Sequence, residues 1–99
     1  MIHALKIEPN YYEDIKSGNK NFEIRKNDRD FRTGDYIALN ELSDTRDEYT
    51  GRSILLKITS IVNDERFCKK GYVIMGFVKC IIIENGYKHI EIVGEMRNI

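Results

Sequence analysis

The sequence predicts an α+β fold that is mostly β: a small β-barrel with one or two short helices at its rim. The chain has 99 residues, 41% of them hydrophobic, which suffices for one core and predicts a single domain over residues 1–99. About six or seven segments have the character of strands, whereas one has the features of a helix. So many strands with so little helix must close on themselves or pack as two sheets, because open sheet edges invite association, and a compact barrel is the simpler of the two.

The chain begins with a predicted strand and a predicted helix. Apolar and charged residues alternate over Ile2–Ile7, as in a strand with one solvated face. Asn10 is a good N-cap with Glu13 three residues later, as in a capping box, and Gly18 suits the left-handed position after a helix. The expected apolar face of this helix consists of Tyr11, Tyr12 and Ile15.

Segment 21–26 is predicted to be a strand with two opposite charges on its polar face. The apolar residues Phe22 and Ile24 alternate with charged ones. Glu23 and Arg25 therefore stand side by side at the two-residue period of a strand. From the residues alone, this pair is either a functional feature or an exposed ion pair worth at most about 1 kcal/mol.

The remaining segments predict the strands that complete the barrel. Residues 51–63 are apolar and β-branched, which favours a central strand. Asn85 and Gly86 form the strongest short hairpin signal in the chain. The other predicted strands are residues 36–40, 72–78, 80–84 and 87–93.

Charge is balanced overall but unevenly distributed. Sixteen basic and sixteen acidic residues leave no net charge, so the chain lacks the general excess of cations that is typical of polyanion binders. Residues 16–33 contain six cations and three anions, whereas residues 41–50 contain four acids and one arginine. The sequence therefore predicts one basic edge and one acidic edge.

Cysteine and histidine are too sparse to predict a metal site, a disulfide or a bound cofactor. Cys68 and Cys80 lack the CxxC spacing of zinc and redox sites, so we expect reduced thiols. His3 and His89 each lie in a strand pattern with no second metal ligand nearby. No apolar run approaches the roughly 20 residues that cross a bilayer, and no signal-peptide pattern is present, so we expect a cytoplasmic protein without a membrane partner.

Residues 18–25 read G-N-K-N-F-E-I-R, which resembles the G-x-K-x-x-E-x-R stretch of ASCH domains in the PUA-like superfamily. With segments 49–52 and 71–76, the resemblance is closest to an uncharacterised ASCH-like family of short bacterial and phage-type proteins. It covers about residues 2–79, and residues 80–99 look like a C-terminal hairpin extension. The resemblance implies a β-barrel with helices at its rim and a cleft that binds RNA or a nucleotide-like ligand.

The candidate binding site is a basic cleft around this segment. Its candidate residues are Lys20, Glu23, Arg25, Lys26 and Arg29. Lysine and arginine make charge-assisted contacts with phosphate, and arginine adds a bidentate fork. Phe31 and Tyr36 are candidates for a stacking face against a base, and the sequence leaves their orientation open. The expected partner is RNA or a nucleotide-like small molecule.

A hydrolase of an acylated nucleoside is the second interpretation. One branch of the superfamily hydrolyses the acetyl amide of N4-acetylcytidine, and the resemblance implies a catalytic set of a lysine, a threonine and a distant glutamate. Lys20 matches the lysine, Glu23 stands where that branch has threonine, and Glu65 lies in the region of the distant acid. In an enzyme, Lys20 and Glu23 are the candidate catalytic residues, with Lys20 as an electrostatic stabiliser.

A protein-interaction module is the third interpretation. The C-terminal hairpin carries more apolar residues than one sheet face needs: Ile81, Ile82, Ile83, Ile90, Ile92 and Val93. Such a hairpin either closes the barrel or pairs with a second copy, which would give a homodimer through the C-terminal hairpin.

Overall fold

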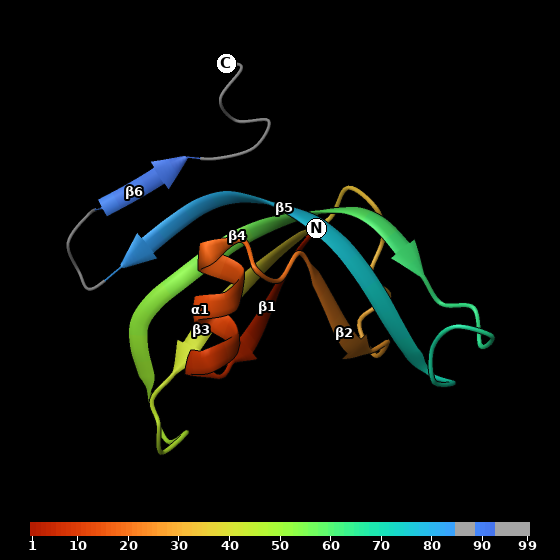
Figure 1. Ribbon diagram of the computed structural model, residues 1–99, viewed down its shortest axis with the longest axis horizontal. Coiled ribbons are helices and arrows are strands. Elements are labelled where there is room, and N and C mark those ends of the chain that lie inside the picture. Colours follow the sequence, from red (N-terminus) through yellow and green to blue (C-terminus); the bar gives the residue numbers. More distant parts are fainter. Residues whose placement is uncertain (85–88, 93–99) are drawn as a thin grey trace.

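The described residues form a curled sheet of six strands and one helix. The computed structural model describes residues 1–84 and 89–92. The elements are β1 (Ile2–Ile7), α1 (Pro9–Ser17), β2 (Phe22–Lys26), β3 (Tyr36–Leu42), β4 (Tyr49–Val62), β5 (Tyr72–Glu84) and β6 (His89–Ile92). This architecture confirms the prediction of a mostly β fold of the α+β class that resembles a barrel (Figure 1).

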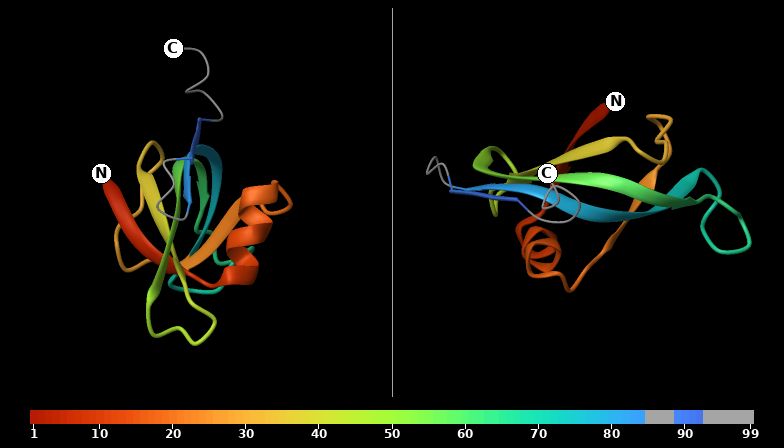
Figure 2. Two further views of the ribbon diagram at one scale, coloured as in Figure 1. Left: turned by 90° about the vertical axis from the view of Figure 1, so that its left-hand side faces the viewer. Right: turned by 90° about the horizontal axis from the view of Figure 1, so that it is seen from above.

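The sheet is a half-barrel whose two edges are β1 and β2. The strand order is β1-β3-β4-β5-β2, and β6 pairs with β5 outside this path. β1 runs parallel to β3, and the other pairs are antiparallel. The long strands β4 and β5 change register after Leu55 and after Ile58, and such irregularities bend strands and increase their twist. β4 and β5 therefore arch over α1 (Figures 1 and 2).

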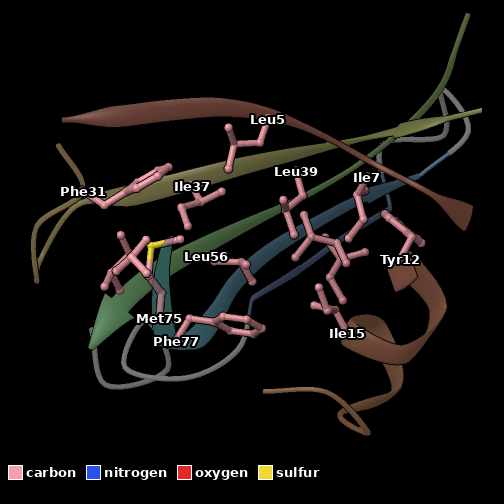
Figure 3. Close-up of a cluster of buried hydrophobic side chains, with 14 residues drawn as sticks. Leu5, Ile7, Tyr12, Ile15, Phe31, Ile37, Leu39, Leu56, Met75 and Phe77 are labelled. Carbon is pink, nitrogen blue, oxygen red and sulfur yellow. The ribbon is translucent and has the colours of Figure 1, made fainter. Parts of the chain in front are cut away.

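The core fills the concave side of this arch. Alternate residues of β1, β3, β4 and β5 point inward, as the two-residue period of a strand requires. α1 contributes Tyr12 and Ile15, both fully buried. The other buried side chains of the cluster in Figure 3 are Leu5, Ile7, Phe31, Ile37, Leu39, Ile54, Leu56, Ile58, Val73, Met75, Phe77 and Ile82.

The helix begins earlier than the capping-box pattern predicts. Glu8 is the N-cap and makes no side-chain capping hydrogen bond, while Pro9 occupies the first turn. Proline favours this position because its fixed φ suits the helix and its missing N–H would have no partner there. The prediction of Asn10 as the N-cap is therefore wrong. Gly18 ends the helix as predicted, with φ 86° and an N–H that donates to the Ile15 carbonyl.

The predicted C-terminal strands are present but divided differently. The segments predicted at 72–78 and 80–84 form the single strand β5. β6 returns antiparallel to it, with Ile83 opposite Ile90, which confirms the predicted return of the chain. The predicted turn at Asn85 and Gly86, the end of the returning arm at Val93 and the side chains of β6 lie outside the described residues. The homodimer through this hairpin stays a prediction.

Candidate functional site

The edge strand β2 points its acid into the molecule and its apolar side chains outward. Glu23 is 3% exposed, whereas Phe22 is 45% and Ile24 is 53% exposed. The interpretation of Glu23 and Arg25 as an exposed ion pair is therefore wrong for Glu23. The outward direction of Phe22 and Ile24 follows from the same alternation, and it leaves two apolar side chains free to line a surface cleft.

Two cations compensate the buried carboxylate of Glu23. Lys20 Nζ lies 2.5 Å from Glu23 Oε1, and Arg25 Nε lies 2.7 Å from Oε2. The side chains of Lys20 and Arg25 are partly exposed. A buried carboxylate is tolerated when it is paired and hydrogen-bonded. This trio, Lys20, Glu23 and Arg25, carries a net charge of +1 and presents its two cations toward solvent.

The turn after α1 places Lys20 between two exposed rings. The backbone N–H of Lys20 donates to the Asp14 carbonyl at 3.0 Å, which fixes the turn that Gly18 begins. Lys20 Nζ lies 4.9 Å from the centroid of the Tyr11 ring and 5.5 Å from that of Phe22. These distances are within the range of cation–π attraction.

An open cleft surrounds this trio. Its volume is about 690 Å³, within the range of small-molecule sites. The lining residues come from the end of β1, the start of α1, the turn after α1 and β2: Lys6, Ile7, Glu8, Tyr11, Lys20, Phe22, Glu23, Ile24 and Arg25. The cleft therefore combines cationic donors with the faces of two aromatic rings.

Two arginines connect β2 and the turn after it to the open edge of β1. Arg25 Nη2 donates to the Lys6 carbonyl at 2.8 Å, and Arg29 Nη1 donates to the Ala4 carbonyl at 2.9 Å. β1 pairs with β3 on its other side, so these carbonyls face the gap between the two sheet edges. Arginine side chains thus bridge the gap of the half-barrel.

A second cleft adjoins the first and shares Ile24 and Arg25 with it. Its volume is about 390 Å³, and its lining residues are Leu5, Ile24, Arg25, Lys26, Asp28, Arg29, Phe31 and Tyr72. The five predicted site residues are therefore divided between two neighbouring clefts. Lys20 and Glu23 line the first, Lys26 and Arg29 line the second, and Arg25 lines both.

The aromatic residues beside the trio differ from those that the sequence suggested. Phe31 is 6% exposed and packs edge-on against the buried His3 ring, so it forms part of the floor of the second cleft. Tyr36 lines neither cleft, and its ring lies near Lys57. The rings that do line the first cleft beside Lys20 are those of Tyr11 and Phe22. The sequence signal for them was their position directly around the G-x-K-x-x-E-x-R stretch.

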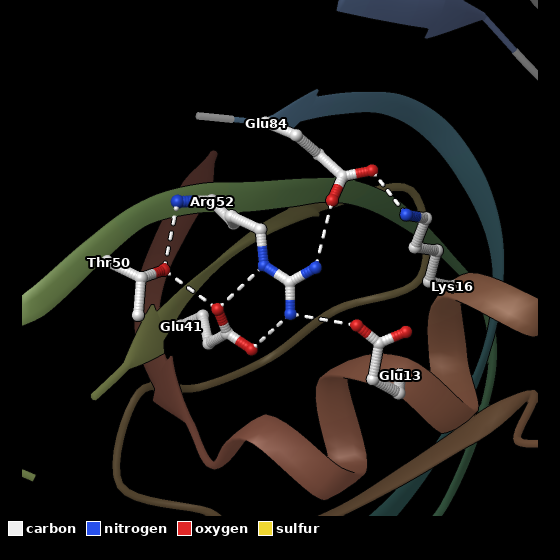
Figure 4. Close-up of polar contacts among 6 residues, drawn as sticks. All are labelled: Glu13, Lys16, Glu41, Thr50, Arg52 and Glu84. Carbon is white, nitrogen blue, oxygen red and sulfur yellow. Dashed lines mark hydrogen bonds and ion pairs between the residues drawn. The ribbon is translucent and has the colours of Figure 1, made fainter. Parts of the chain in front are cut away.

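A second buried ion cluster surrounds Arg52 on β4 (Figure 4). Its guanidinium binds Glu41 in a bidentate manner, through Nε at 2.8 Å and Nη2 at 2.6 Å. Nη2 also lies 2.8 Å from Glu13, and Nη1 donates to Glu84 at 3.0 Å. Lys16 reaches the other oxygen of Glu84 at 2.5 Å. This Arg52 cluster joins α1, β3, β4 and β5.

The Arg52 cluster changes the acidity of the groups around it. Hydrogen bonds from Arg52 hold the pKa of the Glu41 carboxyl below its ordinary value. Burial acts to raise the pKa of Glu84, but hydrogen bonds from Lys16 and Arg52 outweigh it and lower that pKa. Burial raises the pKa of the Tyr12 hydroxyl, whose ring stacks on the Arg52 guanidinium at 4.3 Å. Its oxygen has no hydrogen-bond partner among the described residues.

Within residues 1–84 and 89–92, no three His, Cys, Asp or Glu side chains form a group that could hold a metal ion. His3 Nε2 shares a hydrogen bond of 2.8 Å with Asp35, and Cys68 and Cys80 form no disulfide in the described part of the chain. No helix in the described part of the chain is long and apolar enough to span a membrane.

Comparison with known proteins gives a family and one phage relative. A family model described as "Domain of unknown function (DUF3850)" matches residues 2–77. The "Uncharacterized 12.9 kDa protein in GpA 3'region" of Escherichia phage P2 is 32% identical over 62 residues, which are 63% of this chain. The matched part spans 55% of that relative's length. Both clefts lie within the residues that the family model matches, since the lining residues fall between Leu5 and Tyr72.

Proposed function

The chain belongs to the DUF3850 family, a domain of unknown function, and we propose that it binds a nucleotide-like ligand, free or within single-stranded RNA, in the first cleft. One observation carries this proposal. The buried carboxylate of Glu23 holds Lys20 and Arg25 at the surface of a cleft that is flanked by exposed aromatic rings. A nucleotide has the complementary features: a flat base that can stack on such rings and an anionic phosphate that can bind such cations.

Each group of the cleft has a distinct role in this proposal. Tyr11 and Phe22 offer faces on which an unpaired base can stack. Lys20 and Arg25 supply donors for a carbonyl oxygen or a phosphate oxygen, and such charge-assisted hydrogen bonds are stronger than neutral ones. Glu23 is a positioning residue, because both of its oxygens already bind the two cations.

The charge of the site predicts weak and salt-sensitive binding. The two clefts together contain five cations, Lys6, Lys20, Arg25, Lys26 and Arg29, and three acids, Glu8, Glu23 and Asp28. The chain as a whole has no net charge. Few phosphates can be neutralised at once, so binding to long RNA without a preferred base should be weak and should fall by only about 0.7 logarithmic units per tenfold increase in salt for each phosphate bound.

The resemblance to ASCH domains adds support of a different kind. Gly18, Lys20, Glu23 and Arg25 are the fixed positions of the G-x-K-x-x-E-x-R stretch, and three of the four line the first cleft. Gly18 supplies the left-handed turn from which Lys20 follows. Most fixed positions of this stretch thus belong to the proposed site.

Hydrolysis of an acylated nucleoside is a second candidate function. It is favoured by the position of Lys20, whose side chain is only 19% exposed and lies against an acid inside a cleft. There the ammonium group could stabilise an oxyanion. Glu23 is poorly suited to act as a general base, because two cations occupy its oxygens. This function therefore ranks below binding.

The test is a chemical-shift titration of the isotope-labelled protein with cytidine, cytidine 5′-monophosphate, N4-acetylcytidine and a short single-stranded RNA. We expect shifts at Tyr11, Phe22 and the trio, and their loss in Lys20→Ala and Arg25→Ala. Lys70→Ala and Arg66→Ala are matched controls, because they remove the same charges from exposed positions that line neither cleft. Release of acetate from N4-acetylcytidine would promote the second candidate, and no shifts with any ligand would exclude both.

A further inference from the structure

The second cleft concentrates positive charge beside the proposed base site. Arg25, Lys26 and Arg29 line it together with a single acid, Asp28, so its lining has a net charge of +2. The first cleft has three cations and two acids, a net charge of +1 in a larger volume. The second cleft is therefore the more strongly cationic of the two.

Arg29 differs from the other arginines of the described residues in its partner. Five of them bind a carboxylate: Arg25 with Glu23, Arg32 with Asp30, Arg46 with Glu8, Arg52 with Glu41 and Arg66 with Asp64. Arg29 instead donates to the neutral carbonyl of Ala4. Its guanidinium is held in place at one nitrogen while its charge is not neutralised by an acid in the described part of the chain.

The two clefts are close enough to hold neighbouring parts of one ligand. They share Ile24 and Arg25, and Arg25 contacts both Glu23 of the trio and the β1 edge that Arg29 also contacts. Glu23 and Arg25 are two residues apart on a strand, a separation of roughly 6.6 Å. If one part of a ligand lies in the first cleft and the next part extends past Arg25, that next part therefore enters the second cleft, which Arg29 and Lys26 line.

We infer that the second cleft is a phosphate subsite, which takes the phosphate ester attached to the nucleoside in the first cleft. Arg29 offers free N–H donors in a fixed fork, Lys26 adds a mobile ammonium group, and Arg25 reaches the ester from the side of the base. This inference rests on the proposed function and adds to it that the phosphate of the ligand supplies much of the binding affinity. The same chemistry fits the terminal phosphate of a mononucleotide and the diester of an RNA strand.

The experiment compares ligands that differ only in phosphate. Binding of cytidine, cytidine 5′-monophosphate, cytidine 3′-monophosphate and the dinucleotide CpC is measured on the same labelled protein by chemical-shift titration. We expect at least one phosphorylated ligand to bind about tenfold or more tightly than cytidine at low salt, because hydrogen bonds to charged groups are the stronger ones. Its binding should weaken with salt by roughly 0.7 logarithmic units per tenfold increase for each phosphate bound, whereas that of cytidine should not.

Arg29→Ala and Lys26→Ala separate this inference from the proposed function. Each variant should lose most of the extra affinity for phosphorylated ligands and should bind cytidine as tightly as the wild type does. Lys26→Ala keeps the test informative if Arg29→Ala disturbs the contact with β1, since the described residues show no contact that depends on the Lys26 side chain. Arg66→Ala is the control for charge alone and should leave both affinities unchanged.

Each outcome decides a stated point. Equal affinity for cytidine and all phosphorylated ligands would overturn the phosphate subsite and leave the base site standing. No binding of cytidine or of any cytidine nucleotide would overturn both. A gain with the mononucleotides that CpC does not exceed would support the subsite for a small-molecule ligand, and a further gain with CpC would support it for a strand of RNA.

Discussion

The Arg52 cluster and the Glu23 trio are opposite solutions to the burial of charge. The first places one cation among three carboxylates, those of Glu13, Glu41 and Glu84. The second places one carboxylate between two cations. With Lys16 included, the Arg52 cluster has a net charge of −1, whereas the trio has a net charge of +1. Both clusters compensate a buried carboxylate, that of Glu41 in the first and that of Glu23 in the second, but their net charges are opposite.

The difference in how many donors are used indicates what each cluster does. Arg52 makes four contacts to carboxylates from α1, β3 and β5, out of five N–H donors. In the described residues, Lys20 uses one of three donors and Arg25 uses two of five on protein oxygens. The Arg52 cluster is thus closed and holds elements together, while the trio keeps unused donors, which the proposed function assigns to a ligand.

The largest expected effect is the loss of stability in Arg52→Ala. Glu41 is 2% exposed, and the substitution leaves its charge with only the Thr50 hydroxyl as a side-chain partner among the described residues. Removing one partner of a buried ion pair costs about 3–5 kcal/mol. That is a large fraction of the roughly 5–15 kcal/mol that stabilises a typical domain. Urea unfolding followed by circular dichroism measures the change in the free energy of unfolding.

The matched control for this prediction is the double variant Arg52→Leu with Glu41→Leu. It removes both buried charges together, so we expect it to be more stable than Arg52→Ala, because apolar side chains often replace buried ion pairs at little cost. A double variant as unstable as Arg52→Ala would contradict the view that the unpaired carboxylate causes the loss.

Glu23→Gln should have a smaller effect on stability and a larger one on binding. The cations that it leaves without a carboxylate, Lys20 and Arg25, border an open cleft where water can solvate them, so we expect a loss of about 1–3 kcal/mol. The two donors then lose their fixed positions, and affinity for cytidine 5′-monophosphate should fall about tenfold. Unfolding and titration of the same sample measure both. A stability loss equal to that of Arg52→Ala, with binding intact, would make the trio a structural cluster like the other.

The sequence predicted the fold better than it predicted the direction of side chains at the edge. Period-two alternation and the glycine at the end of α1 sufficed for the presence and order of the strands and the helix, because these signals are local, but not for the N-cap of α1 or the continuity of β5. In β2 the same alternation suggested the wrong face for Glu23. A strand at the edge of a half-barrel can turn its charged residues inward when a neighbouring turn supplies a cation, and Lys20 does so here.

The two charged clusters also differ in how far the sequence could predict them. Lys20, Glu23 and Arg25 are within six residues of one another, so a local pattern brought them together. Arg52 and its acids lie on four elements that are distant in sequence, and only the register of β3, β4 and β5 brings them into contact. No spacing in the sequence marks such a cluster before the strand order is known.

Protonation of Glu41 at acid pH should lower the unfolding free energy of the protein. The pKa of Glu41 is lowered in the folded chain, so its contribution to stability is complete above the ordinary pKa of about 4.3 and is lost as the pH falls through the folded value, because the unfolded chain binds the proton first. Glu41→Gln should therefore flatten the decrease in unfolding free energy between about pH 5 and pH 3. Urea unfolding across this range measures the slope.

Thr50→Val is the graded control for the acid effect. Thr50 donates to Glu41 Oε1 at 2.7 Å, and this hydrogen bond is a smaller cause of the lowered pKa of Glu41 than those from Arg52. For Thr50→Val we therefore expect a dependence of the unfolding free energy on pH that lies between those of the wild type and Glu41→Gln. The unfolding free energy will still decrease with falling pH in both variants, since other acids also have lowered pKa values: Asp35, Asp47, Asp64 and Glu84. A slope unchanged in Glu41→Gln would contradict the assignment.

Lys16→Met should have the smallest effect, because Lys16 is the peripheral member of the Arg52 cluster. Its side chain is 36% exposed, and its partner Glu84 keeps the hydrogen bond from Arg52. The expected loss is about 0.5 kcal/mol or less, the ordinary worth of an exposed pair, measured by urea unfolding at low and high salt. The contact of Lys79 with the Lys16 carbonyl involves only backbone at Lys16 and should survive. If Lys16→Met instead cost as much as Arg52→Ala, and the two losses did not add in the double variant, the cluster would act as one cooperative unit that extends to its rim.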